Sequence, residues 1–300
     1  MTMLVPPPDP DELIVVVGPT ASGKSALAIS LAERYGGEVV NADSVQIYEH
    51  FDIGSGKPTA AERARVPHHL FDAIDPLDAI DAGRYAQLAD RVITDIRNRG
   101  RLPIVCGGTF LWVLALTHGL AQLPAGDAAI RARHAEEAER HGREALHARL
   151  AQVDPKTAAR LAPNDFVRVS RALEVYELTG RPLSELHEAH RFAQQRHRAR
   201  FIGIAWTKEE LAERISRRTR AFLEAGWIDE VSSLVERGYR DARAMSSVGY
   251  KQVLEHLEGK LPASELPDAI DRATRIFARR QRTWLRDRDV LWLEGRGLEL

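Results

Sequence analysis

Short apolar runs alternate with amphipathic segments along the first 120 residues of the chain. The run LIVVV at residues 13–17 is continuous and β-branched, as in a strand buried on both faces of a parallel sheet. The segment SALAISLAERYG that follows has helical spacing and stops at a glycine. Strand-like GEVVNADS, a helical stretch at 83–99, strand-like LPIVCGG and helix-like TFLWVLALTHGL continue the alternation. We therefore predict an α/β fold with a doubly wound parallel sheet.

The alternation stops near Ala125. From there to Gln195 the apolar residues recur at three- and four-residue steps in a charged background, and no strand-like run interrupts them. We interpret 125–195 as an inserted all-helical module, placed between a first core segment at 1–124 and a second core segment at 196–300. In the second core segment, FIGIAW is predicted to return to the sheet and VLWLEG to form a short last strand, with amphipathic helices between them.

Composition places few further limits on the chain. With 300 residues, of which 44% are hydrophobic, it can bury a sizeable core. The N-terminal MTMLVPPPDPDE resembles no signal peptide, and no apolar run is long enough to span a membrane. The single cysteine, Cys106, excludes an internal disulfide and is expected to be a small buried residue at a strand end. We expect a cytoplasmic protein that acts as a monomer and does not contact a membrane.

A net charge of −1 argues weakly against a nucleic-acid partner, but the arginines are clustered. One basic stretch extends from Arg191 to Arg220 and a second, RATRIFARRQRTWLRDR, covers 272–288. Most such stretches are solvated helix faces, so they leave phosphate contacts open without requiring them. Trp227 and Trp284, which lie in or near these stretches, are expected to be core anchors and not platforms for stacked bases.

The strongest motif is GPTASGKS, which fits G-x-x-x-x-G-K-[ST] and lies between a predicted strand and a predicted helix. Its glycines let backbone N–H groups face an anion, Lys24 adds a charge, and the Ser25 hydroxyl is a candidate Mg²⁺ ligand. The residues expected to bind phosphate are Gly18, Pro19, Thr20, Ala21, Ser22, Gly23, Lys24 and Ser25.

Asp43 is the acidic residue that follows the second predicted strand. In an open α/β sheet, ligands lie beyond the carboxyl ends of the strands, so Asp43 should face the same crevice as the phosphate loop. A plain cap of a turn or helix is the alternative. A P-loop kinase would place a magnesium-binding aspartate at a further strand end, yet LPIVCGG ends in Cys-Gly-Gly.

Seven segments in order carry a family resemblance. These are GPTASGKS, NADSVQIY, DIGSGKPT, GGTFLW, DPKTAARLAPNDFVRVSRALEVYELTGRPLS, SSVGYKQ and RRQRTWLR. Together they resemble the tRNA dimethylallyltransferase (tRNA isopentenyltransferase) family, of the bacterial type without a C-terminal zinc finger, over nearly the whole chain. The resemblance implies a loop that holds dimethylallyl diphosphate, not ATP, and an acceptor that is N6 of adenine 37 in the anticodon stem-loop of tRNA.

By the same resemblance, Asp43 matches the general base, Arg218 the arginine that holds the diphosphate together with Lys24, and Thr109 a catalytic residue of the channel where donor and adenine meet. Val167 stands where relatives often have a polar residue, so a contact there would be apolar or through the backbone. The positions implied to contact tRNA are Asp43, Ser44, Val45, Gln46, Thr109, Arg131, Val167, Arg168, Val169, Ser170, Arg171, Ser246, Gly249, Tyr250 and Lys251.

Three other functions share parts of this pattern. A small-molecule kinase would use the loop with ATP, and the missing aspartate after LPIV counts against it. An isopentenyltransferase of free adenine nucleotides would use the same chemistry but would not need the helical insertion or SSVGYKQ. A binding module without catalysis would not need Asp43 and Arg218 together.

Overall fold

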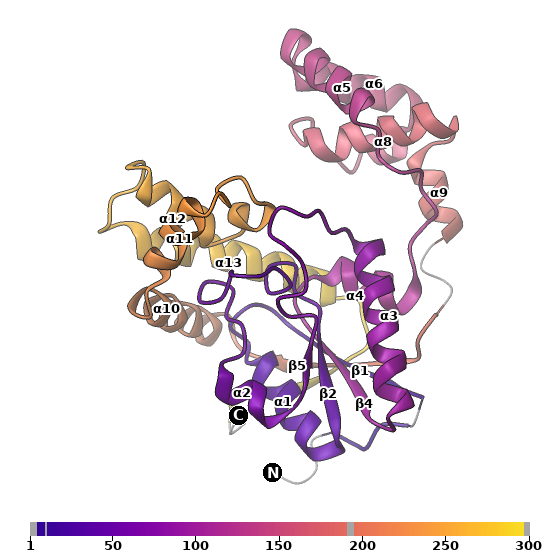
Figure 1. Cartoon of the computed structure of the whole chain (residues 1–300). Helices are drawn as coiled ribbons and strands as arrows, with labels where there is room; N and C mark the ends of the chain where they lie inside the picture. The colour runs from indigo at the N-terminus through magenta and orange to yellow at the C-terminus, as the bar shows by residue number, and fades with distance from the viewer. Residues whose placement is uncertain (1–4, 10, 191–194, 297–300) are drawn as a thin grey trace. The chain divides into compact units, whose positions relative to one another are not determined.

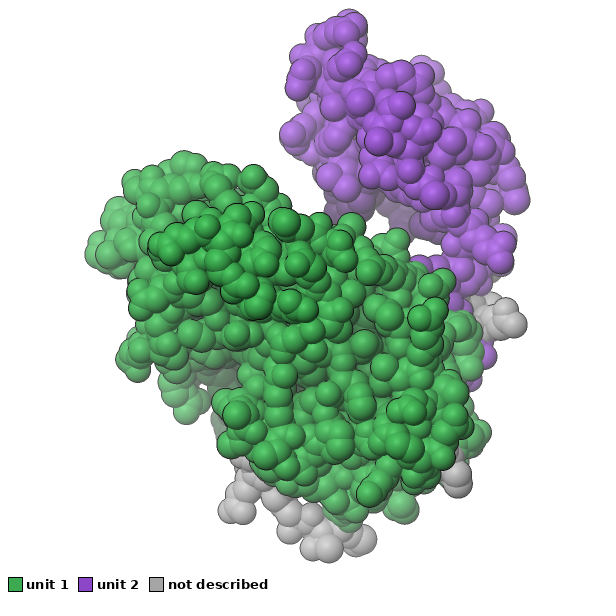
Figure 2. Space-filling view, in the orientation of Figure 1, with its two compact units in different colours: residues 1–117, 196–300 green, residues 118–195 purple. Residues whose placement is uncertain are grey.

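The computed structural model describes residues 5–9, 11–190 and 195–296, and it divides into two compact units. Unit 1 comprises residues 1–117 and 196–300, and unit 2 comprises residues 118–195 (Figure 2). The second unit therefore begins at His118, whereas the sequence analysis placed the start of the insertion at Ala125. In the part of the chain that is described, no helix is both long and apolar enough to cross a membrane.

Unit 1 is built on a six-stranded sheet with the order β3-β2-β4-β1-β5-β6, in which every pairing is parallel. The strands are β1 (Leu13–Val17), β2 (Gly37–Asn41), β3 (His68–His69), β4 (Leu102–Cys106), β5 (Ala199–Ala205) and β6 (Val290–Glu294). This confirms the predicted α/β fold. The sequence analysis treated VPHHLFD as loop, but His68 and His69 pair with Val39 and Val40 as a two-residue edge strand, too short to show an alternating pattern.

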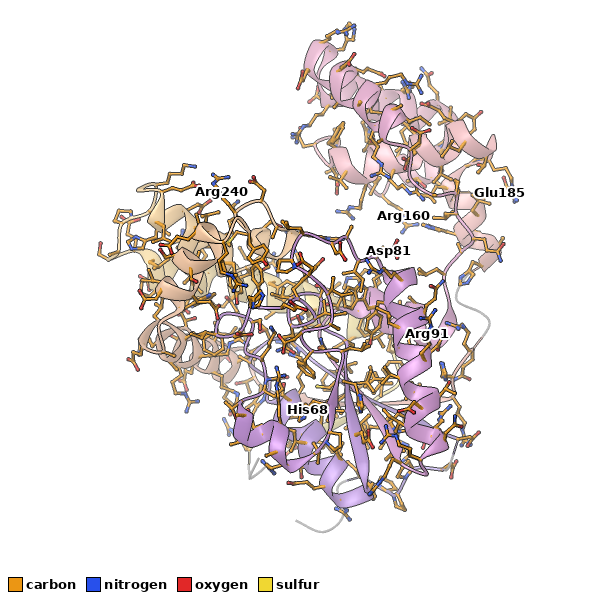
Figure 3. The ribbon with its side chains drawn as sticks, viewed as in Figure 1. His68, Asp81, Arg91, Arg160, Glu185 and Arg240 are labelled. Atoms are coloured by element: carbon orange, nitrogen blue, oxygen red, sulfur yellow. The ribbon has the colours of Figure 1, made fainter. Side chains whose placement is uncertain are left out.

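Helices of unit 1 cover the sheet and extend beyond its end (Figure 1). They are α1 (Lys24–Tyr35), α2 (Ala60–Arg65), α3 (Ala82–Asn98), α4 (Phe110–His118, which ends at the first residue of unit 2), α10 (Lys208–Glu224), α11 (Trp227–Glu236), the 3₁₀ helix η1 (Arg243–Ser246), α12 (Tyr250–Leu257) and α13 (Leu266–Leu285). Asp81, labelled in Figure 3, begins α3 by accepting the Arg84 N–H at 2.8 Å.

The core of unit 1 explains why the central strand reads as a continuous apolar run. Ile14 and Val16 of β1 pack with α1, while Leu13, Val15 and Val17 point to the opposite face, and all five are at most 1% exposed. A strand covered on both faces needs no polar alternation, which is why LIVVV carries none. Cys106, at the end of β4, is buried as expected.

Helices are the only regular secondary structure among the described residues of unit 2. It consists of α5 (Ala128–His141), α6 (Arg143–Val153), α7 (Pro155–Ala158), α8 (Phe166–Thr179) and α9 (Leu183–His190). Leu146 and Leu150 of α6 pack against Val169 and Leu173 of α8. His134 Nδ1 forms a hydrogen bond with the Ser170 hydroxyl at 2.9 Å, so these two buried polar side chains satisfy each other.

Candidate functional site

The phosphate loop lies between β1 and α1, at the carboxyl edge of the sheet. Helix α1 is preceded by Gly23, which offers no side-chain cap, and the helix has no acidic residue in its first turn. Its first N–H groups and its dipole are therefore open to an anion. Ala21 has a positive φ of 63°, a conformation that costs energy for a residue with a side chain. Something must therefore hold the loop in this shape.

Three side chains from the distant half of unit 1 hold it. The Trp206 indole donates to the Ser22 carbonyl at 2.8 Å, and Arg214 Nε donates to the Ala21 carbonyl at 2.8 Å. The Arg214 guanidinium also lies over the Trp206 ring, 4.3 Å from its centroid. Gln281 Oε1 accepts the Thr20 N–H at 2.8 Å. Sequence reasoning missed all three, and the only signal for Gln281 was its place inside RRQRTWLR.

The ends of β2 and β4 meet beside this loop. A Cβ at Gly107 would lie 2.1 Å from the Ala42 carbonyl oxygen, so only glycine permits this approach. Thr109 N–H donates to the Ala42 carbonyl at 3.2 Å, and Thr109 Oγ1 accepts the Ser44 N–H at 2.9 Å. The structure thus brings Asp43, Ser44 and Thr109 together, although Thr109 is distant in sequence.

Asp43 has two different oxygens. Its Oδ1 accepts the N–H groups of Val45 at 2.9 Å and Gln46 at 3.4 Å, which is the turn cap that the sequence analysis kept as an alternative. Its Oδ2 borders the space above Gly108, where a Cβ would lie 3.9 Å away. One oxygen therefore fixes the carboxylate and leaves the other free of the turn.

Two cations share the electrostatic environment of that carboxylate. Burial lowers the pKa of Lys24, against the opposing effect of Asp43, and Arg218 lowers it further. Burial also lowers the pKa of Arg218 to about 10, again with Asp43 opposing. Burial raises the pKa of the neighbouring Cys106 thiol to about 11, so it stays protonated. Two desolvated cations beside a helix N-terminus form a site for a multiply charged anion.

Ser25 is the only candidate magnesium ligand named from the sequence, and its hydroxyl interacts with the Cys106 thiol. No group of three or more metal-ligating side chains occurs within the described ranges. Magnesium commonly takes few protein ligands and completes its shell with water and phosphate oxygens, so a single hydroxyl beside a diphosphate site fits this ion.

The segment SSVGYKQ has a structural role that its sequence did not reveal. A Cβ at Gly249 would lie 2.1 Å from the Trp227 ring, so the glycine lets α12 pack against that buried indole. Tyr250 is fully buried and donates to Glu230 at 2.7 Å. Ser246 and Lys251 are exposed. Tyr250 is one of the residues in this segment that were expected to contact tRNA, but its side chain is turned into the protein.

Glu230 in turn holds the loop that carries DIGSG. Its carboxylate accepts the N–H groups of Asp52 at 3.0 Å, Ile53 at 2.6 Å and Gly54 at 3.3 Å. The Gln46 side-chain amide donates to the other end of this loop, at the carbonyls of Ser55 (3.0 Å) and Gly56 (2.9 Å). Gln46 is therefore positioned by a loop that α11 anchors.

In unit 2 the buried Glu174 gathers two of the expected tRNA contacts. It accepts from Arg131 Nε at 2.9 Å and pairs with Arg171, while these guanidinium side chains remain 56% and 32% exposed. Val167 is 75% exposed, whereas Val169 and Ser170 are buried and cannot contact a partner through their side chains. Arg168 is exposed and pairs with Asp165.

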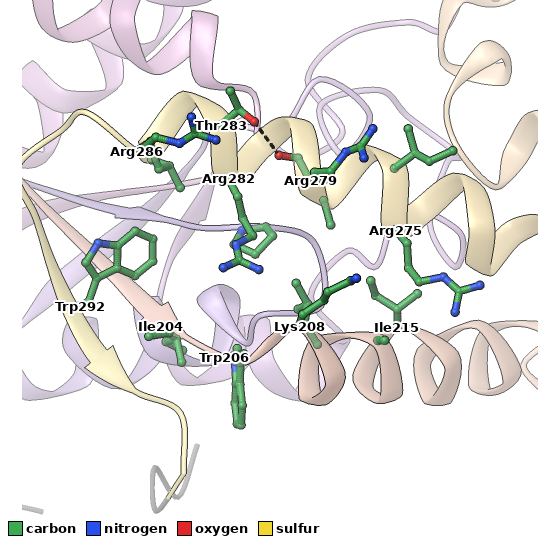
Figure 4. A pocket seen from close by; sticks show the side chains of 17 residues that line it. Ile204, Trp206, Lys208, Ile215, Arg275, Arg279, Arg282, Thr283, Arg286 and Trp292 are labelled. Atoms are coloured by element: carbon green, nitrogen blue, oxygen red, sulfur yellow. Dashed lines mark hydrogen bonds between the residues drawn. The ribbon is translucent and has the colours of Figure 1, made fainter.

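Ion pairs within the protein neutralise only part of the first basic stretch. Arg196 pairs with Asp90, and Arg198 pairs with Asp9, so this part of the first stretch is neutralised within the protein. Arg191 lies outside the described residues. A groove of about 820 Å³ between α10 and α13 (Figure 4) has a cationic rim that makes no ion pair with any residue of the described ranges. The rim consists of Lys208, Arg275, Arg279, Arg282 and Arg286.

Not every sequence expectation about the tryptophans is met. Trp227 is buried, which confirms it as a core anchor, but Trp284 is 52% exposed, so that prediction was wrong. Helix α13 buries Ala278, Gln281 and Leu285, and Trp284 lies beside this stripe with its ring 5.9 Å from Phe110. The helical period leaves room for only one of two neighbouring residues on the buried face.

Comparisons with known proteins show extended similarity in sequence and in fold. Residues 46–288 match the family described as IPP transferase. A protein of Sorangium cellulosum named tRNA dimethylallyltransferase is 64% identical over 96% of this chain and 92% of its own length. The crystal structure of a full-length tRNA isopentenylpyrophosphate transferase from Bacillus halodurans is 37% identical, with a TM-score of 0.70 over 95% of this chain and 90% of that chain.

A eukaryotic dimethylallyltransferase, solved while acting on tRNA, is 28% identical and has a TM-score of 0.80. The match covers 96% of this chain and 75% of that protein. Both the sequence similarity and the structural similarity therefore extend across the two units.

Proposed function

The chain belongs to the IPP transferase family of tRNA-modifying prenyltransferases, and from this premise we propose that it transfers the dimethylallyl group of dimethylallyl diphosphate to N6 of adenine 37 in tRNA, beside the anticodon, with release of diphosphate. The observation that carries the proposal is the convergence of Lys24, Arg218 and the free oxygen of Asp43 at an uncapped helix N-terminus. Phosphate binding alone would not need the carboxylate.

The donor half of the reaction is departure of the diphosphate. Its negative charge grows as the allylic carbon–oxygen bond breaks, so cations that are already desolvated and positioned stabilise the transition state more than the ground state. We assign this role to Lys24, to Arg218 and to the N–H groups at the start of α1. Ser25 would hold Mg²⁺ against the diphosphate, and this ion would add further charge neutralisation.

The acceptor half needs a base. The lone pair of adenine N6 is delocalised into the ring, which makes N6 a poor nucleophile. When N6 bonds to the allylic carbon, it must also lose a proton to give the neutral product. Asp43 Oδ2 is the free carboxylate oxygen beside the donor site, and we assign it this proton. Thr109 and Ser44 fix the turn that carries Asp43 through their mutual hydrogen bonds. The adenine must leave the stacked loop to reach this site.

Contacts with the phosphates of tRNA would offset the cost of extracting the base. We propose two surfaces for them. In unit 2, the side chains of Arg131 and Arg171 remain partly exposed although both pair with Glu174. In unit 1, the cations along the groove of Figure 4, such as Arg279 and Arg282, make no ion pair with any described residue, so an RNA phosphate would have no such partner to displace.

We propose that the protein acts as a monomer, because each residue assigned to the chemistry lies within unit 1 of one chain. We also propose a cytoplasmic location, since the similar proteins are named for tRNA modification. Transfer to free adenine nucleotides and phosphoryl transfer from ATP are not favoured, since relatives similar over almost the whole chain carry names that specify tRNA.

A direct assay tests the proposal. The chain is incubated with labelled dimethylallyl diphosphate and, separately, an anticodon stem-loop, AMP or ADP, with ATP and the stem-loop as a further arm. We expect label in the stem-loop only, and an Asp43→Ala variant should lose transfer by about 10² to 10⁴ while still binding diphosphate. Preferential labelling of AMP or ADP would reject the tRNA acceptor, and near-normal turnover of the variant would remove Asp43 from the mechanism.

A further inference from the structure

The side-chain amide of Gln281, on helix α13, lies between the phosphate loop and the turn that contains Gly108. Gln281 is 7% exposed, and the oxygen and nitrogen of its amide form hydrogen bonds with two different segments. Oε1 accepts the Thr20 N–H at 2.8 Å, and Nε2 donates to the Gly108 carbonyl at 3.0 Å. The first partner lies in the loop after β1 and the second in the turn after β4, so one side chain joins the two halves of the candidate site.

The same amide borders the space that Asp43 faces. A Cβ added at Gly108 would lie 2.3 Å from Gln281 Nε2 and 3.9 Å from Asp43 Oδ2. Both groups therefore line the position that Gly108 leaves open. Because the Gly108 turn continues into Thr109, which bonds to Ser44, a shift of this turn is transmitted directly to the segment that carries Asp43.

We propose that Gln281 is a positioning residue that sets the distance between the diphosphate-binding loop and the Asp43 carboxylate. This inference rests on the proposed function of the same site. Glutamine is the residue type that the geometry requires, because a carboxamide has both an acceptor and a donor at its end. Glutamate keeps an acceptor for Thr20 but has no donor for Gly108, and methionine of similar length has neither.

The reaction is sensitive to this distance. Transfer requires the allylic carbon, held through the diphosphate, to meet an adenine nitrogen whose proton Asp43 receives. A displacement of about 1 Å between two such groups can cost up to about 10²-fold in rate. Gln281 touches neither the donor nor the acceptor in this scheme, so its removal should lower kcat more than it raises the KM for either substrate.

The test compares Gln281→Met with the exposed Asp268→Asn variant on the same helix, which serves as the control. We expect Gln281→Met to fold, to bind inorganic diphosphate within a fewfold of the parent, and to lose about tenfold to 10²-fold in kcat on a stem-loop. The rate of amide exchange at Thr20 in Gln281→Glu should lie between the rates in the parent and in Gln281→Met. Glutamate retains the bond to Thr20 but loses the bond to Gly108.

A double-mutant cycle separates positioning from a general loss of structure. In an Asp43→Asn background the Gln281→Met change should cost at most twofold in kcat, since no base remains to be positioned. Full additivity of the two losses, or an unchanged kcat in Gln281→Met, would overturn the inference.

Hydrogen exchange provides a readout that does not depend on activity. The Thr20 amide should exchange faster in Gln281→Met than in the parent, and at the parent rate in Asp268→Asn. Unchanged protection of Thr20 would contradict the inference whatever the activity. If the parent itself failed to modify any stem-loop, the proposed function would fail, while accelerated exchange at Thr20 would still support the bridge between the two segments.

Discussion

Removal of the Tyr250 hydroxyl is the most sharply defined perturbation that unit 1 allows. It donates to Glu230 at 2.7 Å, and burial, followed by the neighbouring carboxylate charge, raises its pKa well above the ordinary value. The phenol therefore remains a donor throughout the physiological range. Tyr250→Phe removes this one bond and keeps the ring contacts with Phe51 and Trp227, whose centroids lie 4.9 Å and 5.6 Å away.

The size of the effect follows from the charge and exposure of the acceptor. A hydrogen bond to a charged group contributes about 1.5 to 3 kcal/mol. Glu230 is half-buried and keeps three backbone donors, so water can replace part of what is lost, and we expect a value near the lower end, about 1.5 kcal/mol. This corresponds to roughly a tenfold larger unfolding constant and a Tm lower by about 3 to 6 °C.

Urea and thermal unfolding followed by circular dichroism measure this change. Tyr239→Phe is the matched control, because the structure gives the Tyr239 hydroxyl no hydrogen-bond partner among the described residues, and it should leave stability within about 0.5 kcal/mol. The slope of the free energy against urea should be the same in both variants. A Tyr250→Phe protein as stable as the control would show that the Glu230 network does not stabilise this region.

We also expect Tyr250→Phe to affect catalysis on the tRNA substrate. Glu230 anchors the loop at 51–56, and this loop receives the Gln46 side chain. A loosened loop should lower kcat/KM for an anticodon stem-loop by a fewfold and leave diphosphate binding unaltered, because none of these contacts involves the phosphate loop. Weaker diphosphate binding in Tyr250→Phe would refute this separation.

Three further predictions concern charge. Diphosphate should raise the burial-lowered pKa of Lys24, so binding should be accompanied by proton uptake at pH values below the ordinary pKa of lysine. Binding should also weaken as the pH rises toward the pKa of Arg218 near 10. Calorimetry in buffers of different ionisation enthalpy should detect the proton uptake, and its absence would contradict the assignment. The Cys106 thiol, with a pKa near 11, should resist alkylation at pH 8 until the protein unfolds, and rapid labelling of the native protein would argue against its burial. Arg279→Gln and Arg282→Gln should each lower the salt slope of stem-loop binding by about 1 without changing diphosphate affinity, and unaltered slopes would exclude this groove from RNA binding.

Much of the fold could be predicted because its signals are local. A continuous apolar run such as residues 13–17 indicates a strand covered on both faces, and a phosphate loop must stand between a strand and a helix. Neighbours along the chain create these patterns, so one sequence is enough to detect them. The edge strand at His68–His69 escaped detection because two residues cannot display a period, and its pairing with β2 depends on a partner distant in sequence.

The residues of the candidate site likewise fall into two groups, those that the local sequence reveals and those that it does not. Lys24 and Ser25 belong to a contiguous motif, and Asp43 follows a recognisable strand, so these residues could be named from the sequence. The roles of Gln281, Trp206, Arg214 and Glu230 could not, because each bonds to a segment that is remote along the chain.

Tertiary structure also decided which of the expected residues are accessible. Tyr250 and Ser170 lie in segments expected to contact tRNA, yet both side chains are buried. The groove arginines of α13, in contrast, lie at the surface and make no ion pair within the part of the chain that the structure describes. A sequence records which charges and hydroxyls a segment contains. Whether each is neutralised, buried or free depends on what packs against it, and the partners in such packing come from anywhere in the chain.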